Sequence, residues 1–414
     1  MLKKYSFQSI FLVVFFGDFN LSLLQVASIS YGVQLGASPS QNGLIGAAYG
    51  ISYLIMAALL GRLGDKLSRK TSLLCALISQ ILVSLYIVAF ASTVELLILG
   101  QFLLGCAYGF FWPTIEASIS ENTEKSMDSH RRGISNFCIS WSLGYTVGPF
   151  LAGIFSDIFI NVAFILALFV YFTGLIIIVL FIPNVSTSSS DNEKFVAHKG
   201  VPLPLSANYV NNETIDVTHL NKINLNSTKY ILVRILFGML IYAMCGKIAL
   251  TYFPDYASRP NGLNFSGTLI GLILFLFGIG RTAYFVLSRV LTSSLRRITF
   301  SYFVISVLLT SMLFIHTLGI LIMVFIAFGL CSGLIYKSSL ELLLYYEKEA
   351  KGAKAGLFES AIGLGSALTP FIAGLFAELL LILPFMIFAI IAFIVFLCNL
   401  IFDRIAIKVK NETN

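Results

Sequence analysis

Long apolar runs, separated by short polar segments, follow one another along the whole chain. Twelve of them come close to or exceed the roughly 20 residues that a helix needs to cross a bilayer. Lipid offers no hydrogen-bond partners to the backbone, so each run is expected to form a helix. The expected spans are residues 8–35, 42–61, 71–91, 94–117, 134–155, 160–182, 230–253, 266–290, 298–317, 319–344, 355–378 and 383–402.

Composition supports a membrane protein and changes the meaning of the net charge. The chain is 57% hydrophobic and only 11% charged, whereas soluble domains carry about 25% charged residues. A net charge of +7 is compatible with nucleic-acid binding. The cations, however, lie in short loops between apolar runs, which is the pattern of membrane topology. We therefore predict that the protein lies in a lipid bilayer and does not bind a nucleic acid.

The distribution of lysine and arginine predicts the orientation. If both termini are cytoplasmic, 23 of the 27 cations fall in cytoplasmic loops and tails or near the cytoplasmic ends of the adjoining spans. Arg259 alone falls in an outer loop, and three further cations lie deep inside spans. Such a bias determines topology. It predicts a multi-pass protein of the cell membrane with both termini cytoplasmic.

A polar segment and an internal repeat divide the chain into halves. Residues 183–229 are rich in Ser, Asn and Thr and are expected to form a cytoplasmic linker between bundles at 1–182 and 230–414. The sequence Gly-Tyr-Thr-Val-Gly-Pro-Phe-Leu-Ala-Gly at 144–153 resembles Gly-Ser-Ala-Leu-Thr-Pro-Phe-Ile-Ala-Gly at 365–374, 221 residues later. Paired halves are typical of transporters, with the binding site between them near mid-membrane.

The loop after the second span carries the most specific motif, Gly61-Arg-Leu-Gly-Asp-Lys-Leu-Ser-Arg-Lys70. It resembles the signature loop of the major facilitator superfamily, with Ser68 in place of the usual glycine. The resemblance extends over essentially the whole chain. It implies an all-α membrane fold, in which two six-helix bundles related by pseudo-two-fold symmetry surround a central cavity.

The same resemblance implies a gating contact and a packing motif. Asp65 would lie near the start of span eleven, and Arg69 would pair with Glu121, latching the halves on the cytoplasmic side. Gly61 belongs to the same gating motif and suits a close helix approach or a turn. The fifth span contains a second motif, made of Gly144, Gly148, Pro149 and Gly153. It resembles a motif that is more frequent in proton-driven exporters. Close packing of small residues around a proline kink is its physical basis, and ordinary helix packing explains it as well.

Polar and ionisable residues inside spans are costly and are therefore candidates for function. Asp18 lies about halfway along the first span and is a candidate proton carrier, although a permanent pair with a lysine is the alternative. Glu116 fits either the cavity or the cytoplasmic latch. The acids could pair with the lysines as a gate, or the lysines could hold an anionic or zwitterionic substrate; Glu341, four residues after Lys337, offers that lysine a pair within its own helix. The candidate substrate and proton site comprises Asp18, Asn20, Gln25, Glu116, Lys247 and Lys337.

No motif predicts an enzyme, a cofactor or a metal site. The chain lacks a phosphate-binding G-x-x-x-x-G-K-[ST] loop and the H-E-x-x-H spacing of zinc enzymes. We predict a monomeric secondary transporter that moves a small organic solute by alternating access, coupled to protons, with efflux favoured. An uptake carrier for a sugar, organic acid or amino acid is the closest alternative. A membrane sensor without transport activity is an alternative of another class.

Overall fold

Helices joined by short connections form the whole of the described structure. The computed structural model describes residues 2–63, 68–123, 127–182, 225–288, 294–315, 317–346 and 351–413, which contain no strand. The first half comprises α1 (Leu2–Gln34), α2 (Pro39–Leu63), α3 (Arg69–Phe90), α4 (Val94–Thr123), α5 (Met127–Ile158) and α6 (Asn161–Phe181). The second half comprises α7 (Leu225–Lys247), the π-helical turn η3 (Ile248–Tyr252), α8 (Phe253–Ser258), α9 (Gly267–Leu287), α10 (Leu295–Ser311), α11 (Leu318–Tyr346), α12 (Lys351–Ala377) and α13 (Leu383–Thr413).

Twelve helical segments result, because α7, η3 and α8 run on without a break. Eleven of them, within the described residues, are long and apolar enough to cross a bilayer. The segment that falls short is α10, with 17 residues. The sequence predicts a span over 298–317 there, but the helix begins three residues earlier and ends at Ser311.

The seventh span continues past its predicted end at residue 253. Pro254 follows that end, and proline usually interrupts a helix because it lacks an N–H group and its ring clashes with the carbonyl four residues earlier. The helix instead widens into a π turn over Ile248–Tyr252 and then continues to Ser258. A π turn pairs each carbonyl with the amide five residues on, so the ladder tolerates the proline.

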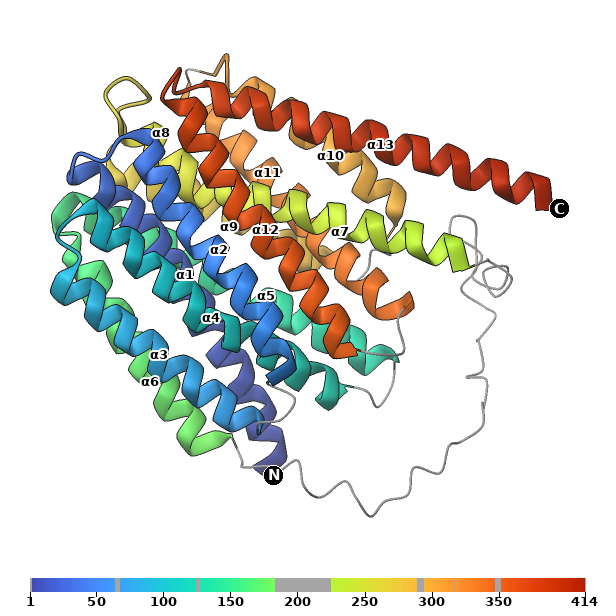
Figure 1. Cartoon of the computed structure of the whole chain (residues 1–414), viewed down its shortest axis with the longest axis horizontal. Helices are drawn as coiled ribbons and strands as arrows, with labels where there is room; N and C mark the ends of the chain where they lie inside the picture. The colour runs from blue at the N-terminus through green and yellow to red at the C-terminus, as the bar shows by residue number, and fades with distance from the viewer. Residues whose placement is uncertain are drawn as a thin grey trace.

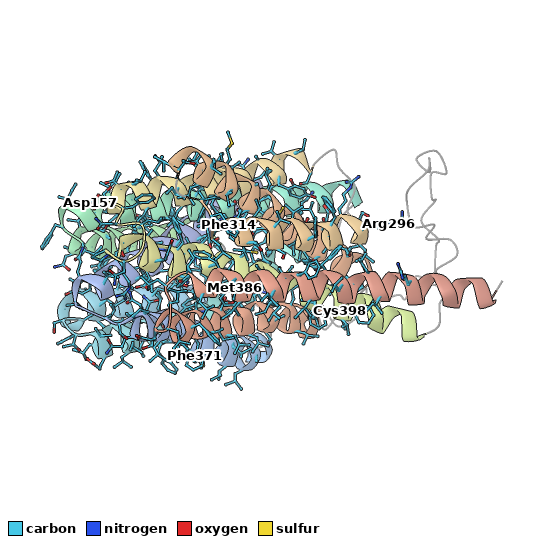
Figure 2. The ribbon with its side chains drawn as sticks, turned by 90° about the horizontal axis from the view of Figure 1, so that it is seen from above. Asp157, Arg296, Phe314, Phe371, Met386 and Cys398 are labelled. Atoms are coloured by element: carbon cyan, nitrogen blue, oxygen red, sulfur yellow. The ribbon has the colours of Figure 1, made fainter. Side chains whose placement is uncertain are left out.

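Apolar side chains cover the outside of the helix bundle. On α6, Phe169, Ile176 and Leu180 are more than half exposed, which suits a surface that faces lipid tails. Figure 2 shows side chains such as Phe371 projecting from the helices around the body. In the same view Asp157 lies at one end of the long axis and Arg296 toward the other. The C-terminal part of α13 extends beyond the rest of the bundle (Figure 1).

The two halves meet along α2 against α12 and α5 against α9. In each pair two glycines allow the backbones to touch. A Cβ atom on Gly43 would lie 2.8 Å from Cα of Gly374, and one on Gly153 would lie 2.8 Å from Cα of Gly271. Gly153 and Gly374 occupy the same place in the two copies of the repeated sequence. The repeat therefore builds the same helix contact twice.

Polar contacts join the halves at one end of the bundle. We call this the distal end; it carries the connections at residues 35–38, 159–160, 259–266 and 378–382. The Asp157 carboxylate accepts hydrogen bonds of 2.7 Å from the backbone N–H groups of Gly267 and Thr268 and from the Thr268 hydroxyl. The Glu378 carboxylate accepts from the Ser40 N–H at 3.0 Å and the Ser40 hydroxyl at 2.7 Å.

A third distal contact involves Arg259, the predicted outer cation. Its guanidinium pairs with Asp255 at 2.8 Å and donates to the Ala37 carbonyl at 2.8 Å. The other half contributes a second donor to Asp255, the Asn42 amide, at 2.5 Å. Asp255 is buried, so these bonds replace the water that the carboxylate loses.

The predicted linker and cytoplasmic latch lie mostly outside the described residues. The structure describes nothing of 183–224, while 225–229 belong to the first turns of α7. Asp65 and the side chain of Glu121 are also outside, so the latch stays a prediction. Ser68, which departs from the family glycine, is described: its hydroxyl accepts from the Thr71 N–H at 3.1 Å and caps α3.

Candidate transport site

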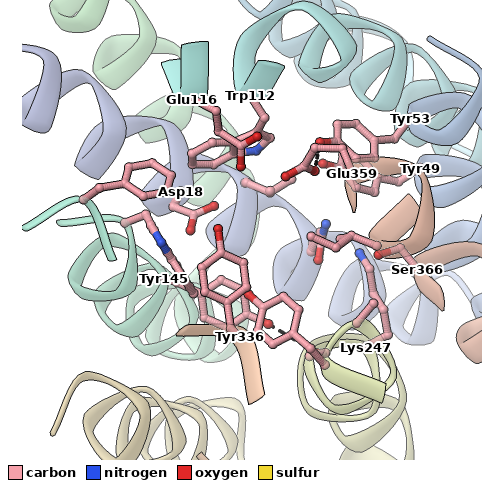
Figure 3. Close-up of a pocket in the computed structure, with 18 residues that line it drawn as sticks. Asp18, Tyr49, Tyr53, Trp112, Glu116, Tyr145, Lys247, Tyr336, Glu359 and Ser366 are labelled. Atoms are coloured by element: carbon pink, nitrogen blue, oxygen red, sulfur yellow. Dashed lines mark hydrogen bonds between the residues drawn. The ribbon is translucent and has the colours of Figure 1, made fainter. Parts of the chain in front are cut away.

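A central cavity lies between the two halves. It has a volume of about 100 Å³ and is lined by α1, α2, α4 and α5 from one half and by α7, α11 and α12 from the other. Most of these helices present side chains three or four residues apart, which is the spacing of one helix face. The lining consists of Asp18, Leu21, Gln25, Tyr49, Tyr53, Trp112, Glu116, Phe137, Trp141, Tyr145, Tyr242, Ala243, Gly246, Lys247, Tyr336, Glu359, Ile362 and Ser366 (Figure 3).

The first helix places two of the predicted polar residues in this cavity. Asp18 and Gln25 share a face of α1 with Leu21 and are buried. Neither side chain makes a hydrogen bond within the described residues, so both are available to a ligand. Asn20 lies on another face, where its amide donates to the Ala167 carbonyl at 3.1 Å. The structure thus separates Asn20 from the cavity and gives it a role in packing α1 against α6.

Lys247 enters the cavity from α7 and crosses to the other half. Its ammonium nitrogen lies 4.5 Å from the centre of the Tyr49 ring, a cation–π contact between α7 and α2. It has no hydrogen-bond acceptor among the described residues. Asp18 is close enough to interact with it electrostatically, yet the two form no ion pair. The alternative of a permanent pair between Asp18 and a lysine is therefore not what the structure contains.

A pair of carboxyl groups crosses between the halves. Glu116 on α4 and Glu359 on α12 are hydrogen-bonded to each other, and the Tyr53 hydroxyl donates to Glu359. Ionised carboxylates only accept, so a bond between two carboxyl groups needs a proton on one of them. Figure 3 shows these groups on the side of the cavity that also holds Trp112. Glu116 thus lies in the cavity, where it meets a partner that the sequence analysis did not select.

Arg281 lies behind the cavity wall and is fully buried. Its guanidinium is 3.7 Å from the centre of the Tyr145 ring and 4.6 Å from that of Trp141, and its Nε donates to the Ser142 hydroxyl at 3.1 Å. Its two terminal nitrogens have no hydrogen-bond partner of good geometry in the described part of the chain. Arg281 also interacts electrostatically with Asp18. The aromatic rings therefore separate a buried positive charge from the cavity.

Lys337 lies away from the cavity, in contrast to its place among the predicted site residues. Its ammonium pairs with Glu341 at 2.9 Å and donates to the Ser288 carbonyl at 2.9 Å. The side chain is almost fully buried. The helical neighbour four residues on and a carbonyl of the preceding segment therefore satisfy this lysine, and no free ammonium is left for a substrate.

The glycines of the fifth span pack on two different helices. A Cβ atom on Gly144 would lie 2.2 Å from the Phe15 carbonyl oxygen, and one on Gly148 would lie 2.4 Å from that of Phe19. These two glycines therefore allow α5 to touch α1 inside the first half. Gly153, one turn beyond Pro149, contacts α9 of the second half. The motif joins packing within a half to packing between halves.

Aromatic rings from both halves enclose the cavity. Trp141 of α5 lies 5.0 Å from Tyr336 of α11, and Tyr336 lies 4.8 Å from Tyr242 of α7, measured between ring centres. These rings form a continuous wall across the junction of the halves. No group of three or more His, Cys, Asp or Glu side chains suited to a metal ion occurs among the described residues.

The sequence matches a known family over most of its length. The family model described as Major Facilitator Superfamily matches residues 10–344. The uncharacterized MFS-type transporter YuxJ of Bacillus subtilis (strain 168) is 31% identical over 137 residues, 32% of this chain and 33% of that protein. A multi-drug resistance efflux pump PmrA homolog of Lactococcus lactis subsp. lactis (strain IL1403) is 32% identical over 108 residues, 26% of each chain. The matched segments span about a third or less of these relatives.

Solved structures share the fold over nearly the full length. The human organic anion transporter MFSD10 (TETRAN) superposes with a TM-score of 0.66 at 14% identity, covering 96% of this chain and 99% of that one. The nucleoside transporter NupG gives a TM-score of 0.65 at 16% identity, covering 96% and 98%. At such identities the likeness establishes the all-helical architecture of two bundles.

Proposed function

The chain belongs to the Major Facilitator Superfamily, a family of transporters and not of enzymes, and we propose that it moves a small organic solute by alternating access in exchange for protons. One observation carries this proposal. The Asp18 carboxylate is buried, faces the cavity between the halves, and has no hydrogen-bond donor within the described residues. A carboxylate in that position can load a proton from whichever side the cavity opens to and release it on the other.

The arrangement of charges supports a role of Asp18 in coupling. Arg281, Glu359 and Lys247 interact with it electrostatically, and all three belong to the second half of the chain. When the halves rock about the central site, these charges move relative to α1. The proton affinity of Asp18 then differs between the two open states, which is what coupling requires.

We propose export as the direction, with the distal end outside the cell. The Lactococcus lactis relative is an efflux pump homolog, and Arg259 is the one cation that the positive-inside pattern assigns to an outer loop. Uptake of a nutrient is the second candidate. It would use the same cavity and the same carboxylate, with solute and proton moving together.

The test is transport in proteoliposomes with an imposed pH gradient. The solutes are those that raise the unfolding temperature of the purified protein, since a ligand that binds only the native state stabilises it. Asp18→Asn should abolish proton-driven accumulation but still allow exchange between solute pools when the solute is saturating. Glu95→Gln, at an exposed position in the first turn of α4, is the matched control and should transport as the parent does. Accumulation against a gradient by Asp18→Asn would refute the proton role.

A further inference from the structure

We infer that the substrate is a small zwitterion whose ammonium group binds Asp18 and whose acidic group binds Lys247. This inference rests on the proposed transport function and names the class of its substrate. It starts from the fact that the cavity presents one free carboxylate and one free ammonium. Asp18 comes from the first half and Lys247 from the second, and both line the same space (Figure 3).

Two other buried charged groups have an ion-pair partner within the protein, and a third, Arg281, is held against aromatic rings behind the cavity wall. Asp255 pairs with Arg259 at 2.8 Å, and Lys337 pairs with Glu341 at 2.9 Å. Asp18 and Lys247, in contrast, have neither an ion pair nor a side-chain hydrogen bond within the described residues. A buried charge without a partner is costly. The contrast indicates that the missing partners of Asp18 and Lys247 are supplied from outside the chain.

The Lys247 ammonium contacts the Tyr49 ring and forms no ion pair with Asp18. The ring holds the ammonium at 4.5 Å from its centre but accepts no conventional hydrogen bond, so the three N–H donors of the lysine remain available. A carboxylate can therefore bind Lys247 without first breaking an ion pair. The Gln25 amide lies on the same face of α1, two turns from Asp18, and is a further free donor and acceptor in the cavity.

Charge balance selects a zwitterion over a simple ion. An anion at Lys247 would leave Asp18 facing a second negative charge, and a cation at Asp18 would face both Lys247 and Arg281. Glu116 and Glu359 share a hydrogen bond and hold one proton between them, so the pair carries one negative charge, which offsets the positive charge of Arg281. A ligand with one charge of each sign satisfies Asp18 and Lys247 together and connects the two halves.

This substrate class also explains why exchange with protons would follow. The ligand's ammonium and a proton compete for the same Asp18 carboxylate, so the two leave the cavity in different halves of the cycle. The proton-loaded cavity carries one more positive charge than the substrate-loaded cavity. Transport should therefore respond to membrane voltage as well as to the pH gradient.

The experiment measures binding to the purified full chain at pH 7, without any gradient. The probes are phenylalanine, γ-aminobutyrate and ε-aminohexanoate, which differ in carbon skeleton and in the distance between their two charges. Each is compared with its methyl ester, which is a cation, and its N-acetyl derivative, which is an anion. A hydrogen bond between charged groups is worth roughly 10- to 100-fold in affinity. For at least one of the three parent compounds, the zwitterion should bind more tightly than both of its derivatives by about that factor.

Variants assign each charge to its residue. In Lys247→Gln the zwitterion and its ester should bind equally, because the carboxylate no longer has a partner. In Asp18→Asn the zwitterion and its N-acetyl derivative should bind equally. Lys247→Arg should retain the order of the parent, and so should Lys337→Gln, which removes a buried lysine outside the cavity. Each protein serves as its own reference, so a general loss of stability does not imitate these results.

Two outcomes would overturn the inference. One is that, for each of the three parent compounds, the ester or the N-acetyl derivative binds as tightly as the zwitterion. The other is that none of the nine compounds binds. The first outcome, together with proton-driven transport of that ion, would leave the proposed function standing. Tight zwitterion binding without transport in a pH gradient would instead refute the proposed function and leave the binding inference intact.

Discussion

Two of the polar contacts that join the halves at the distal end are copies of one design with different strengths. Asp157 follows Gly153 by four residues, and Glu378 follows Gly374 by four residues, at the repeat offset of 221. Each carboxylate bonds to the first turn of a helix in the other half, α9 or α2. A negative charge is favoured there because the first N–H groups of a helix have no partner within it.

The difference lies in how the helix start is held. Asp157 accepts hydrogen bonds from two successive backbone N–H groups and one hydroxyl, whereas Glu378 accepts from a single backbone N–H group, that of Ser40, besides serine hydroxyls. The weaker copy is accompanied by the Arg259 contact to Ala37, which crosses between the same halves. A duplicated interface thus keeps its geometry while its polar contacts diverge.

The largest effect is expected from the contact that is not duplicated. Arg259→Gln removes the ion-pair partner of buried Asp255 and should cost about 3 kcal/mol in the free energy of unfolding. Denaturant titration in detergent measures this loss. The double variant with Asp255→Asn should recover part of it, since no uncompensated charge remains. A double variant that is less stable than Arg259→Gln would contradict this account.

Of the two glycine contacts between the halves, the one at Gly153, on the helix that carries Asp157, should tolerate substitution less than the one at Gly374. A methyl group on Gly153 would lie 2.3 Å from the Gly267 carbonyl oxygen, whereas on Gly374 its nearest atom is the Pro39 carbonyl oxygen at 2.8 Å. Gly153→Ala should therefore destabilise by about 2 kcal/mol and Gly374→Ala by about 1 kcal/mol. Gly319→Ala is the control, because no atom lies within 4 Å of its added methyl group. Equal losses at the two interface positions would show that the backbones adjust freely.

The two carboxylates can be compared by opening the distal end. A cysteine at Ser366, in the cavity wall, reports access when an impermeant maleimide is added from the distal side. Asp157→Asn should increase its labelling more than Glu378→Gln, in keeping with a loss of about 1 kcal/mol against a few tenths for such exposed contacts. In the double variant the free-energy effects of the two substitutions should add, because the two carboxylates share no partner. Labelling of the parent without the new cysteine gives the background.

The smallest effect is the acid sensitivity of the Glu378 contact. Hydrogen bonds from the Ser38 and Ser40 hydroxyls and from the Ser40 N–H lower the pKa of Glu378 below its ordinary value. A lowered pKa means that the contact is fully present above the ordinary glutamate pKa of about 4.3 and is lost as the pH falls through the lowered value. The difference in unfolding temperature between the parent and Glu378→Gln should stay constant from pH 7 to 5 and shrink below pH 4. A difference that shrinks already between pH 7 and 5 would contradict the lowered pKa.

Much of the fold could be predicted from sequence because lipid leaves few alternatives. Apolar length alone located the spans, and the copies at 144–153 and 365–374 predicted related halves that the glycine contacts now reproduce. Local exceptions were not predictable from the same rules. The π turn over Ile248–Tyr252 allows a helix to pass Pro254, and nothing in the hydropathy of that segment signals it.

The candidate site was predicted less completely, and the reasons differ by residue. Glu359 lies inside the expected span 355–378, so the rule that selected Asp18 would also have found it. Lys337 met that rule but is satisfied by Glu341 and a carbonyl, which depends on rotamers and on a neighbouring segment. Asn20 differs from Gln25 only in which face of α1 it occupies. Which charged residues pair, and which face of a helix lines the cavity, is decided only when the helices pack together.

The π turn after Lys247 has a mechanical consequence for the central cavity. An α-helix transmits rotation and translation along its axis as a rigid rod, whereas a wider turn is a joint where the two parts can bend. The joint lies at Ile248–Tyr252, between the cavity lysine on α7 and the distal contacts that begin at Asp255 on α8. Bending there would let the distal end open while Lys247 stays near Tyr49. The Lys247 side chain would then continue to point into the cavity throughout the transport cycle.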